Sequence, residues 1–141
     1  MKILVVDDDP GMRECLTAMC ELEGHSVIAA GTLREAMDVL ESDEIEAVVV
    51  DGHFPFDAGL PVVPLGPFLL GLAVGRGLRH CLVSGDSDLV TGCQLSGIPA
   101  LLKPASQSKI FALLDECPAR VHSLPPNIQE ALNMGDGTYR P

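Results

Sequence analysis

The chain alternates between short apolar runs of strand length and amphipathic stretches of helical period, and this alternation constrains its fold most. Residues 3–6 and 47–50 are continuous apolar runs, as expected of strands that are covered on both faces. Thr32 and Glu35 form a capping box that opens an amphipathic helix ending at about Ser42. Strands that alternate with helices in this way are typical of an α/β domain with a parallel sheet.

Five such strand–helix pairs can be placed along the chain. The pattern predicts strands at 3–6, 26–30, 47–50, 80–83 and 100–102, and helices at 12–23, 33–42, 68–77, 88–95 and 107–116. We therefore expect a (βα)5 domain over residues 1–117, with a doubly wound five-stranded parallel sheet. Residues 118–141 are expected to form a C-terminal tail, with one short helical candidate at 127–134. Residues 54–67 are rich in proline and carry no element in this prediction.

The composition excludes several classes of partner. Nine Lys and Arg against 20 Asp and Glu give a net charge of −11, whereas binding to a phosphate backbone or an anionic lipid needs a basic surface. We therefore expect no direct contact with nucleic acid or membrane. An odd number of cysteines without CxxC spacing favours reduced, mostly buried thiols in a cytoplasmic protein; they are Cys15, Cys20, Cys81, Cys93 and Cys117.

Polar residues follow four of the predicted strands, at the sheet edge where ligands bind in such folds. Asp7 and Asp8 end the first strand, Asp51 the third, Ser84 the fourth and Lys103 the fifth. Converging carboxylates repel one another, so the cluster favours a hard divalent cation such as Mg²⁺. With a lysine and a serine opposite, a carboxylate in this cluster could accept a phosphoryl group.

The chain resembles the receiver domain of bacterial two-component response regulators. The resemblance extends over about residues 1–117 and implies a flavodoxin-like sheet with strand order 2-1-3-4-5. It depends on the ordered combination of several motifs, since a single Asp-Asp or Lys-Pro dipeptide would carry no information. The motifs are Asp7-Asp8-Asp9-Pro10 after the first strand, Asp51 with Pro55 and Gly59 beyond it, Ser84-Gly85, and Lys103-Pro104, whose peptide bond is usually cis in the family.

The resemblance also implies a role for each site residue. Asp51 would be the phosphoacceptor, and Mg²⁺ would be held by Asp8, Asp51 and the backbone carbonyl of His53, with Asp7 acting through water. Lys103 would contact the acceptor carboxylate and then the phosphoryl group, and Ser84 would follow that group and transmit the change. The family implies a histidine kinase or histidine phosphotransfer protein as donor, and a downstream protein partner.

Several departures from the family pattern concern the switch and not the chemistry. Ala100 stands where relatives carry an aromatic side chain that rotates together with the hydroxyl residue. The stretch between Asp51 and Ser84 is a few residues longer than usual, and that between Ser84 and Lys103 a few residues shorter, which predicts a truncated fourth helix. Asp86 either adds a charge beside the site or caps that helix.

Three functional hypotheses follow. The first is a stand-alone receiver that is modified at Asp51, catalyses only its own phosphorylation and dephosphorylation, and signals through protein contacts. The second is a pseudo-receiver that works as a constitutive interaction module, which Ala100 favours. The third is a small Mg²⁺-dependent phosphohydrolase, although His53 stands where its general acid is required.

Two segments of the chain allow more than one structural interpretation. The apolar stretch 60–74 fits a partner-binding face and a buried third helix equally well. The tail helix candidate could dock on the domain or fray.

Overall fold

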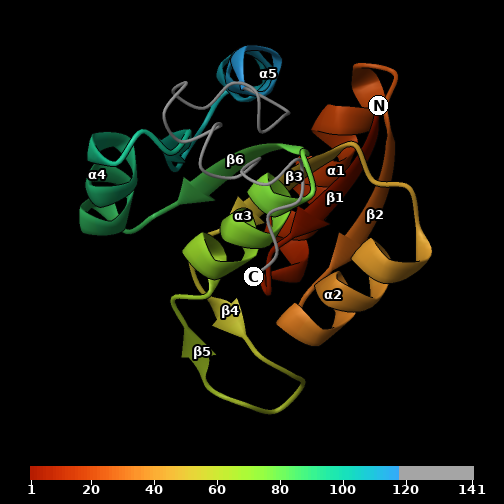
Figure 1. Ribbon diagram of the computed structural model, residues 1–141, viewed down its shortest axis with the longest axis vertical. Coiled ribbons are helices and arrows are strands. Elements are labelled where there is room, and N and C mark those ends of the chain that lie inside the picture. The colour runs from red at the N-terminus through yellow and green to blue at the C-terminus, as the bar shows by residue number, and fades with distance from the viewer. Residues whose placement is uncertain (118–141) are drawn as a thin grey trace, which may run out of the picture.

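The structure, a computed structural model, describes residues 1–117 of the chain (Figure 1). Its centre is a five-stranded sheet in the order β2-β1-β3-β6-β7, with every neighbouring pair parallel. With β6 and β7 as the fourth and fifth strands of this sheet, the order is the predicted 2-1-3-4-5. The strands are β1 (Lys2–Val6), β2 (Ser26–Ala30), β3 (Ala47–Asp51), β6 (Arg79–Ser84) and β7 (Ala100–Leu102).

Five helices cover the two faces of this sheet. The apolar side chains of β1 alternate between the faces, because Leu4 and Val6 belong to one core cluster and Ile3 and Val5 to the other. Helices α2, α3 and α4 pack on the first cluster, whereas α1 and α5 pack on the second. The helices are α1 (Pro10–Leu22), α2 (Leu33–Ser42), α3 (Gly66–Gly75), α4 (Ser87–Leu95) and α5 (Gln107–Glu116).

Side-chain caps fix where four of the helices begin. Asp9 accepts a hydrogen bond from the Gly11 amide at 2.9 Å, and Thr32 accepts one from the Glu35 amide at 3.1 Å. Ser106 caps α5 in the same way. The predicted start of α1 at residue 12 is two residues late, because Pro10 occupies the first turn, where a missing N–H costs nothing.

A small antiparallel hairpin lies between the third strand and α3, and the sequence did not predict it. It consists of β4 (Phe54–Pro55) and β5 (Val62–Val63) and projects beyond the main sheet, beside α2 and α3 (Figure 1). Phe54 is fully buried and anchors the hairpin on the core. Helix α3 begins at Gly66 and not at residue 68, because the Gly66 amide donates to the Gly52 carbonyl at 3.0 Å and starts the helix there.

Helix α3 combines both interpretations of the apolar stretch. Leu69, Leu70 and Ala73 are buried against the sheet, whereas Phe68 and Val74 are about half exposed. The stretch therefore supplies a core helix and also leaves apolar side chains on the surface.

The buried cysteines match the prediction of thiols inside the fold. Cys20, Cys81 and Cys93 are buried, and Cys15 is exposed. Burial raises the pKa of Cys20 to about 11 and that of Cys81 to about 12, so both stay protonated at neutral pH. Among the helices of residues 1–117, none combines the length and the apolar character that a membrane span requires.

The predicted tail, residues 118–141, and its helix candidate lie outside the described residues. The boundary between domain and tail stays a prediction.

Candidate functional site

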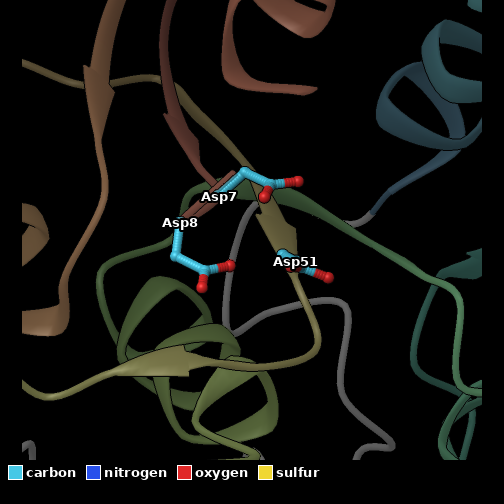
Figure 2. Close-up of side chains that lie close together, drawn as sticks. All are labelled: Asp7, Asp8 and Asp51. Atoms are coloured by element: carbon cyan, nitrogen blue, oxygen red, sulfur yellow. The ribbon is translucent and has the colours of Figure 1, made fainter. Parts of the chain in front are cut away.

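Three carboxylates meet at the carboxyl ends of β1 and β3. Val6 and Val50 are register partners in these adjacent strands, so the residues that follow them, Asp7 and Asp51, emerge side by side. One oxygen from each of Asp7, Asp8 and Asp51 lies within 4.8 Å of the other two, and Figure 2 shows the three side chains gathered there. Asp7 is fully buried and Asp51 is 9% exposed, whereas Asp8 is partly exposed.

Lys103 supplies a positive charge to this cluster. Its Nζ lies 3.0 Å from Asp7 Oδ2 and 3.4 Å from Asp51 Oδ1. A backbone hydrogen bond holds this part of the chain in place, because the Lys103 amide donates to the Ser84 carbonyl at 2.8 Å. The following peptide bond, Lys103–Pro104, is cis, as the resemblance implied. The ends of β1, β3 and β7 are thereby joined at one point.

The electrostatics of the cluster follow from burial and from like charge. Burial, and then the nearby charge of Asp7, raise the pKa of Asp51, although Lys103 and a 2.7 Å hydrogen bond from the Gly52 amide partly oppose this effect. Burial alone would lower the pKa of Lys103, but its contacts with Asp7 and Asp51 outweigh burial and raise it. One lysine against three carboxylates leaves the site with excess negative charge.

The donor set fits a hard divalent cation. In an octahedral Mg²⁺ site with bonds of about 2.1 Å, ligand oxygens lie about 3 to 4.2 Å apart. The carboxylate oxygens of Asp7, Asp8 and Asp51, which lie within 4.8 Å of one another, come close to that spacing. A cation would also offset the repulsion that raises the pKa of Asp51.

Ser84 lies close to Gly52, the residue that follows Asp51. Its side chain is buried, and its Oγ accepts a hydrogen bond from the Asp86 amide at 3.1 Å. A Cβ atom on Gly52 would lie 2.6 Å from Ser84 Oγ and 2.5 Å from Leu89 Cδ2. A larger residue after Asp51 would therefore require the side chains of Ser84 and Leu89 to shift. The sequence does not predict this constraint, because its cause lies in β6 and α4.

His53 and Asp86 form a contact between two loops beside the site. His53 Nε2 lies 3.5 Å from Asp86 Oδ2, and both side chains are partly exposed. Asp86 also accepts hydrogen bonds from the Asp88 and Leu89 amides, which confirms the capping interpretation of this residue. The sequence does not predict this pair, because no local pattern links residues of two separate loops.

Ala100 occupies the position at which the resemblance expects an aromatic switch residue. It lies in β7, is almost fully buried, and belongs to the core cluster beneath α3 and α4. Ala100 is the register partner of Leu82, which lies two residues before Ser84 in β6. A small side chain thus fills this place in the core, and no aromatic ring is present at this position to rotate.

Comparisons with known proteins agree with this fold. The family model described as "Response regulator receiver domain" matches residues 3–64. Response regulator MprA of Mycolicibacterium vanbaalenii is 45% identical over 62 residues, which are 44% of this chain and 27% of MprA. The sensory/regulatory protein RpfC of Xanthomonas campestris is 28% identical over 120 residues, which are 81% of this chain and 16% of RpfC.

Solved structures share the fold. Response regulator protein TrrA of Thermotoga maritima, in complex with Mg²⁺-BeF, superposes with a TM-score of 0.66 at 21% identity, over 82% of this chain and 96% of TrrA. Residues 3–64 thus match the response regulator receiver domain family, and solved structures of CheY-like receiver domains share the fold over 82% of the chain. Members of this family are generally phosphoacceptor switches of two-component systems and not conventional enzymes. The chain spans only about a sixth of RpfC and about a quarter of MprA, at 16% and 27% of their lengths.

Proposed function

We propose that the chain is a phosphorylation-dependent switch in which Asp51 accepts a phosphoryl group from a histidine kinase or histidine phosphotransfer protein. The observation that carries this proposal is the position of the Asp51 carboxylate. It lies 3.4 Å from the Lys103 ammonium and shares one cluster with Asp7 and Asp8. Receiver domains interact with such phosphoryl donors, which supports the choice of partner.

The two oxygens of Asp51 have different surroundings. Oδ1 accepts the Gly52 amide at 2.7 Å and also faces Lys103 Nζ at 3.4 Å. These contacts fix the carboxylate, so that Oδ2 is the oxygen best placed to attack phosphorus. As the new O–P bond forms, the bond between phosphorus and the donor's imidazole nitrogen breaks. The donor imidazole, already protonated on its other ring nitrogen, leaves in its neutral form.

Lys103 and Ser84 act on the product of this transfer. Lys103 offsets negative charge on the phosphoryl oxygens, and the Ser84 hydroxyl donates a hydrogen bond to one of them. In the present structure Ser84 Oγ instead accepts the Asp86 amide. Rotation of this hydroxyl towards Asp51 would therefore disturb the start of α4, which Asp86 caps.

Mg²⁺ would be held by Asp8, Asp51 and the backbone carbonyl of His53, with Asp7 acting through a water molecule. When bound it supplies positive charge that compensates the clustered carboxylates. The Mg²⁺-BeF complex of TrrA, which has the same fold, supports this choice of cation.

A second candidate is a pseudo-receiver that binds its partner without phosphorylation. The small, buried Ala100 favours it, because the aromatic side chain that would report on Ser84 is missing. This candidate requires that Asp51→Asn leaves affinity for the partner unchanged. The phosphohydrolase is not favoured, since the His53 imidazole lies against Asp86 and offers no carboxylic acid.

The proposal is tested with acetyl phosphate, a donor that needs no partner protein. Wild-type chain incubated with acetyl phosphate and Mg²⁺ should gain the mass of one phosphoryl group, and Asp51→Asn should gain none. Asp57→Asn, which changes an exposed acid paired with Arg34, is the matched control and should react as wild type does. Absence of any mass gain in wild type would refute the proposal. The stand-alone arrangement stays a prediction, which the mass of the protein from its native cells tests.

A further inference from the structure

Apolar side chains are exposed mainly on one segment of the surface. Ten large apolar residues are exposed in the part of the chain that the structure describes, and six of them lie between residues 56 and 74. We call these six the apolar face; they are Phe56, Leu60, Val62, Val63, Phe68 and Val74. Side chains of this size, each about half exposed, offer on the order of 500 Å² of apolar surface, an extent that commonly marks a binding site.

Helix α3 has the surface of a helix that packs on two sides. Its outward positions include Phe68, Gly71 and Val74, and no charged residue occurs anywhere in the helix. A helix that faces water normally carries polar residues there. Gly71 and Gly75 are exposed, with no atom within 4 Å of where a Cβ would stand. An exposed glycine costs a helix roughly 0.5–1 kcal/mol relative to alanine, but it allows a second helix to approach closely.

The negative charge of the chain restricts which surface two copies can share. The chain carries a net charge of −11, so most contacts between two copies would bring acidic groups together. Residues 58–75 are the longest uncharged run in the sequence and contribute five of the six residues of the apolar face. Two copies can therefore meet along this run without adding like charges.

The hairpin restricts the kind of contact that forms. Its outer strand, β5, is flanked by Pro61 and Pro64, which have no backbone N–H. Proline at a strand edge opposes the addition of another strand. The contact must therefore form through side chains, as in the packing of one helix on another.

We propose that the apolar face joins two copies of the chain in a symmetric dimer, in which α3 of one copy packs on α3 of the other. Because the same surface is used twice, about 1,000 Å² is buried in total, at the lower end of specific interfaces. We expect a dissociation constant in the micromolar range, about 1–100 μM. The proposal does not depend on phosphorylation of Asp51.

Sedimentation velocity of the full chain, from about 1 to 500 μM, tests the proposal by mass action. Wild type should change from monomer to dimer over this range. Phe68→Glu, at a residue that is 53% exposed, should weaken the dimer at least tenfold. The control is Leu22→Glu, which makes the same change at a residue that is 80% exposed at the end of α1, on the other side of the sheet. It should leave the dimer unchanged.

Each other outcome overturns the proposal. Wild type that stays monomeric at the highest concentration excludes the dimer. Dimerisation that resists both Phe68→Glu and Val62→Glu, while both variants keep the wild-type circular dichroism spectrum, places the interface elsewhere. If removal of residues 118–141 converts a monomer into a dimer that Phe68→Glu disrupts, the tail and not a second copy covers the face in the full chain.

Discussion

The Lys103 ammonium lies 3.0 Å from the carboxylate of Asp7, although 96 positions separate the two residues in the sequence. Asp7 is fully buried, and its second oxygen accepts the Asp9 amide at 2.9 Å. The side-chain contact joins the interior strand β1 to the edge strand β7 across the site. It therefore matters both for the stability of the domain and for the chemistry at Asp51.

Lys103→Met should destabilise the domain, because it leaves the buried Asp7 carboxylate without its counter-charge. Loss of one partner of a buried pair costs 3–5 kcal/mol, and the partial exposure of Lys103 reduces our expectation to about 1–3 kcal/mol. Urea unfolding measures the change. Lys109→Met, at an exposed lysine of α5, is the control and should remain within about 0.5 kcal/mol of wild type. Equal losses in the two variants would contradict the assigned role of Lys103.

Asp51→Asn should stabilise the protein in the absence of divalent cations. Burial and the charge of Asp7 raise the pKa of Asp51, so its ionised form costs folding free energy at neutral pH. We expect the variant to melt about 2–5 °C above wild type in EDTA. Excess Mg²⁺ should raise the melting temperature of wild type and raise that of the variant much less. A variant that is less stable than wild type in EDTA would show that Asp51 is not under electrostatic strain.

The difference in stability between wild type and Asp51→Asn should depend on pH. A carboxyl group whose pKa is raised by folding stabilises the folded state when protonated, and this contribution is lost as pH rises through the folded-state pKa. Wild type and Asp51→Asn should therefore converge in stability in acid and diverge towards neutral pH. Melting curves from pH 4 to pH 7 in EDTA measure this trend. A constant difference across that range would contradict it.

Two glycines of α3 should respond in opposite ways to alanine. A Cβ on Gly66 would lie 2.5 Å from the Asp51 carbonyl oxygen and 2.9 Å from Gly52 Cα, so backbone must move to admit it. We expect Gly66→Ala to cost about 1–3 kcal/mol and to disturb the acceptor loop. Gly71 has open space around it, so Gly71→Ala should be neutral or stabilise the fold by up to about 1 kcal/mol. Urea unfolding at low protein concentration measures the change in unfolding free energy for each of the two variants.

Two substitutions of Asp86 can separate its role as the cap of α4 from its contact with His53. Asp86→Ala removes both interactions and should cost about 0.5–2 kcal/mol. Asn also caps helices well, so Asp86→Asn should retain most of the stability while removing the carboxylate that contacts His53. Equal destabilisation by the two variants would show that the loop contact, and not the cap, holds this region.

Much of the fold follows from local patterns in the sequence. The strands of the main sheet are apolar runs, and the helix starts carry capping residues such as Asp9 and Thr32. Parallel strands place their carboxyl ends at one edge, so the meeting of Asp7, Asp51 and Lys103 could also be expected.

The features that escaped prediction depend on contacts between distant segments. Strands of two residues, such as β4 and β5, are too short to show alternation, and their prolines favour a loop. Helix α3 has no polar side to set off its buried side, so the sequence pattern predicts its start two residues late. The tight space at Gly52 arises from the side chains of Ser84 and Leu89, which come much later in the chain.

The central claim is that the phosphoryl group is carried by Asp51 itself. Borohydride reduces an aspartyl phosphate to homoserine, and peptide mass mapping then locates the modified position. After treatment with acetyl phosphate and Mg²⁺, the account predicts homoserine at position 51 alone, and none when Mg²⁺ is replaced by EDTA. Homoserine at Asp7 or Asp8, or at no position despite a gain of mass in the intact chain, would contradict it.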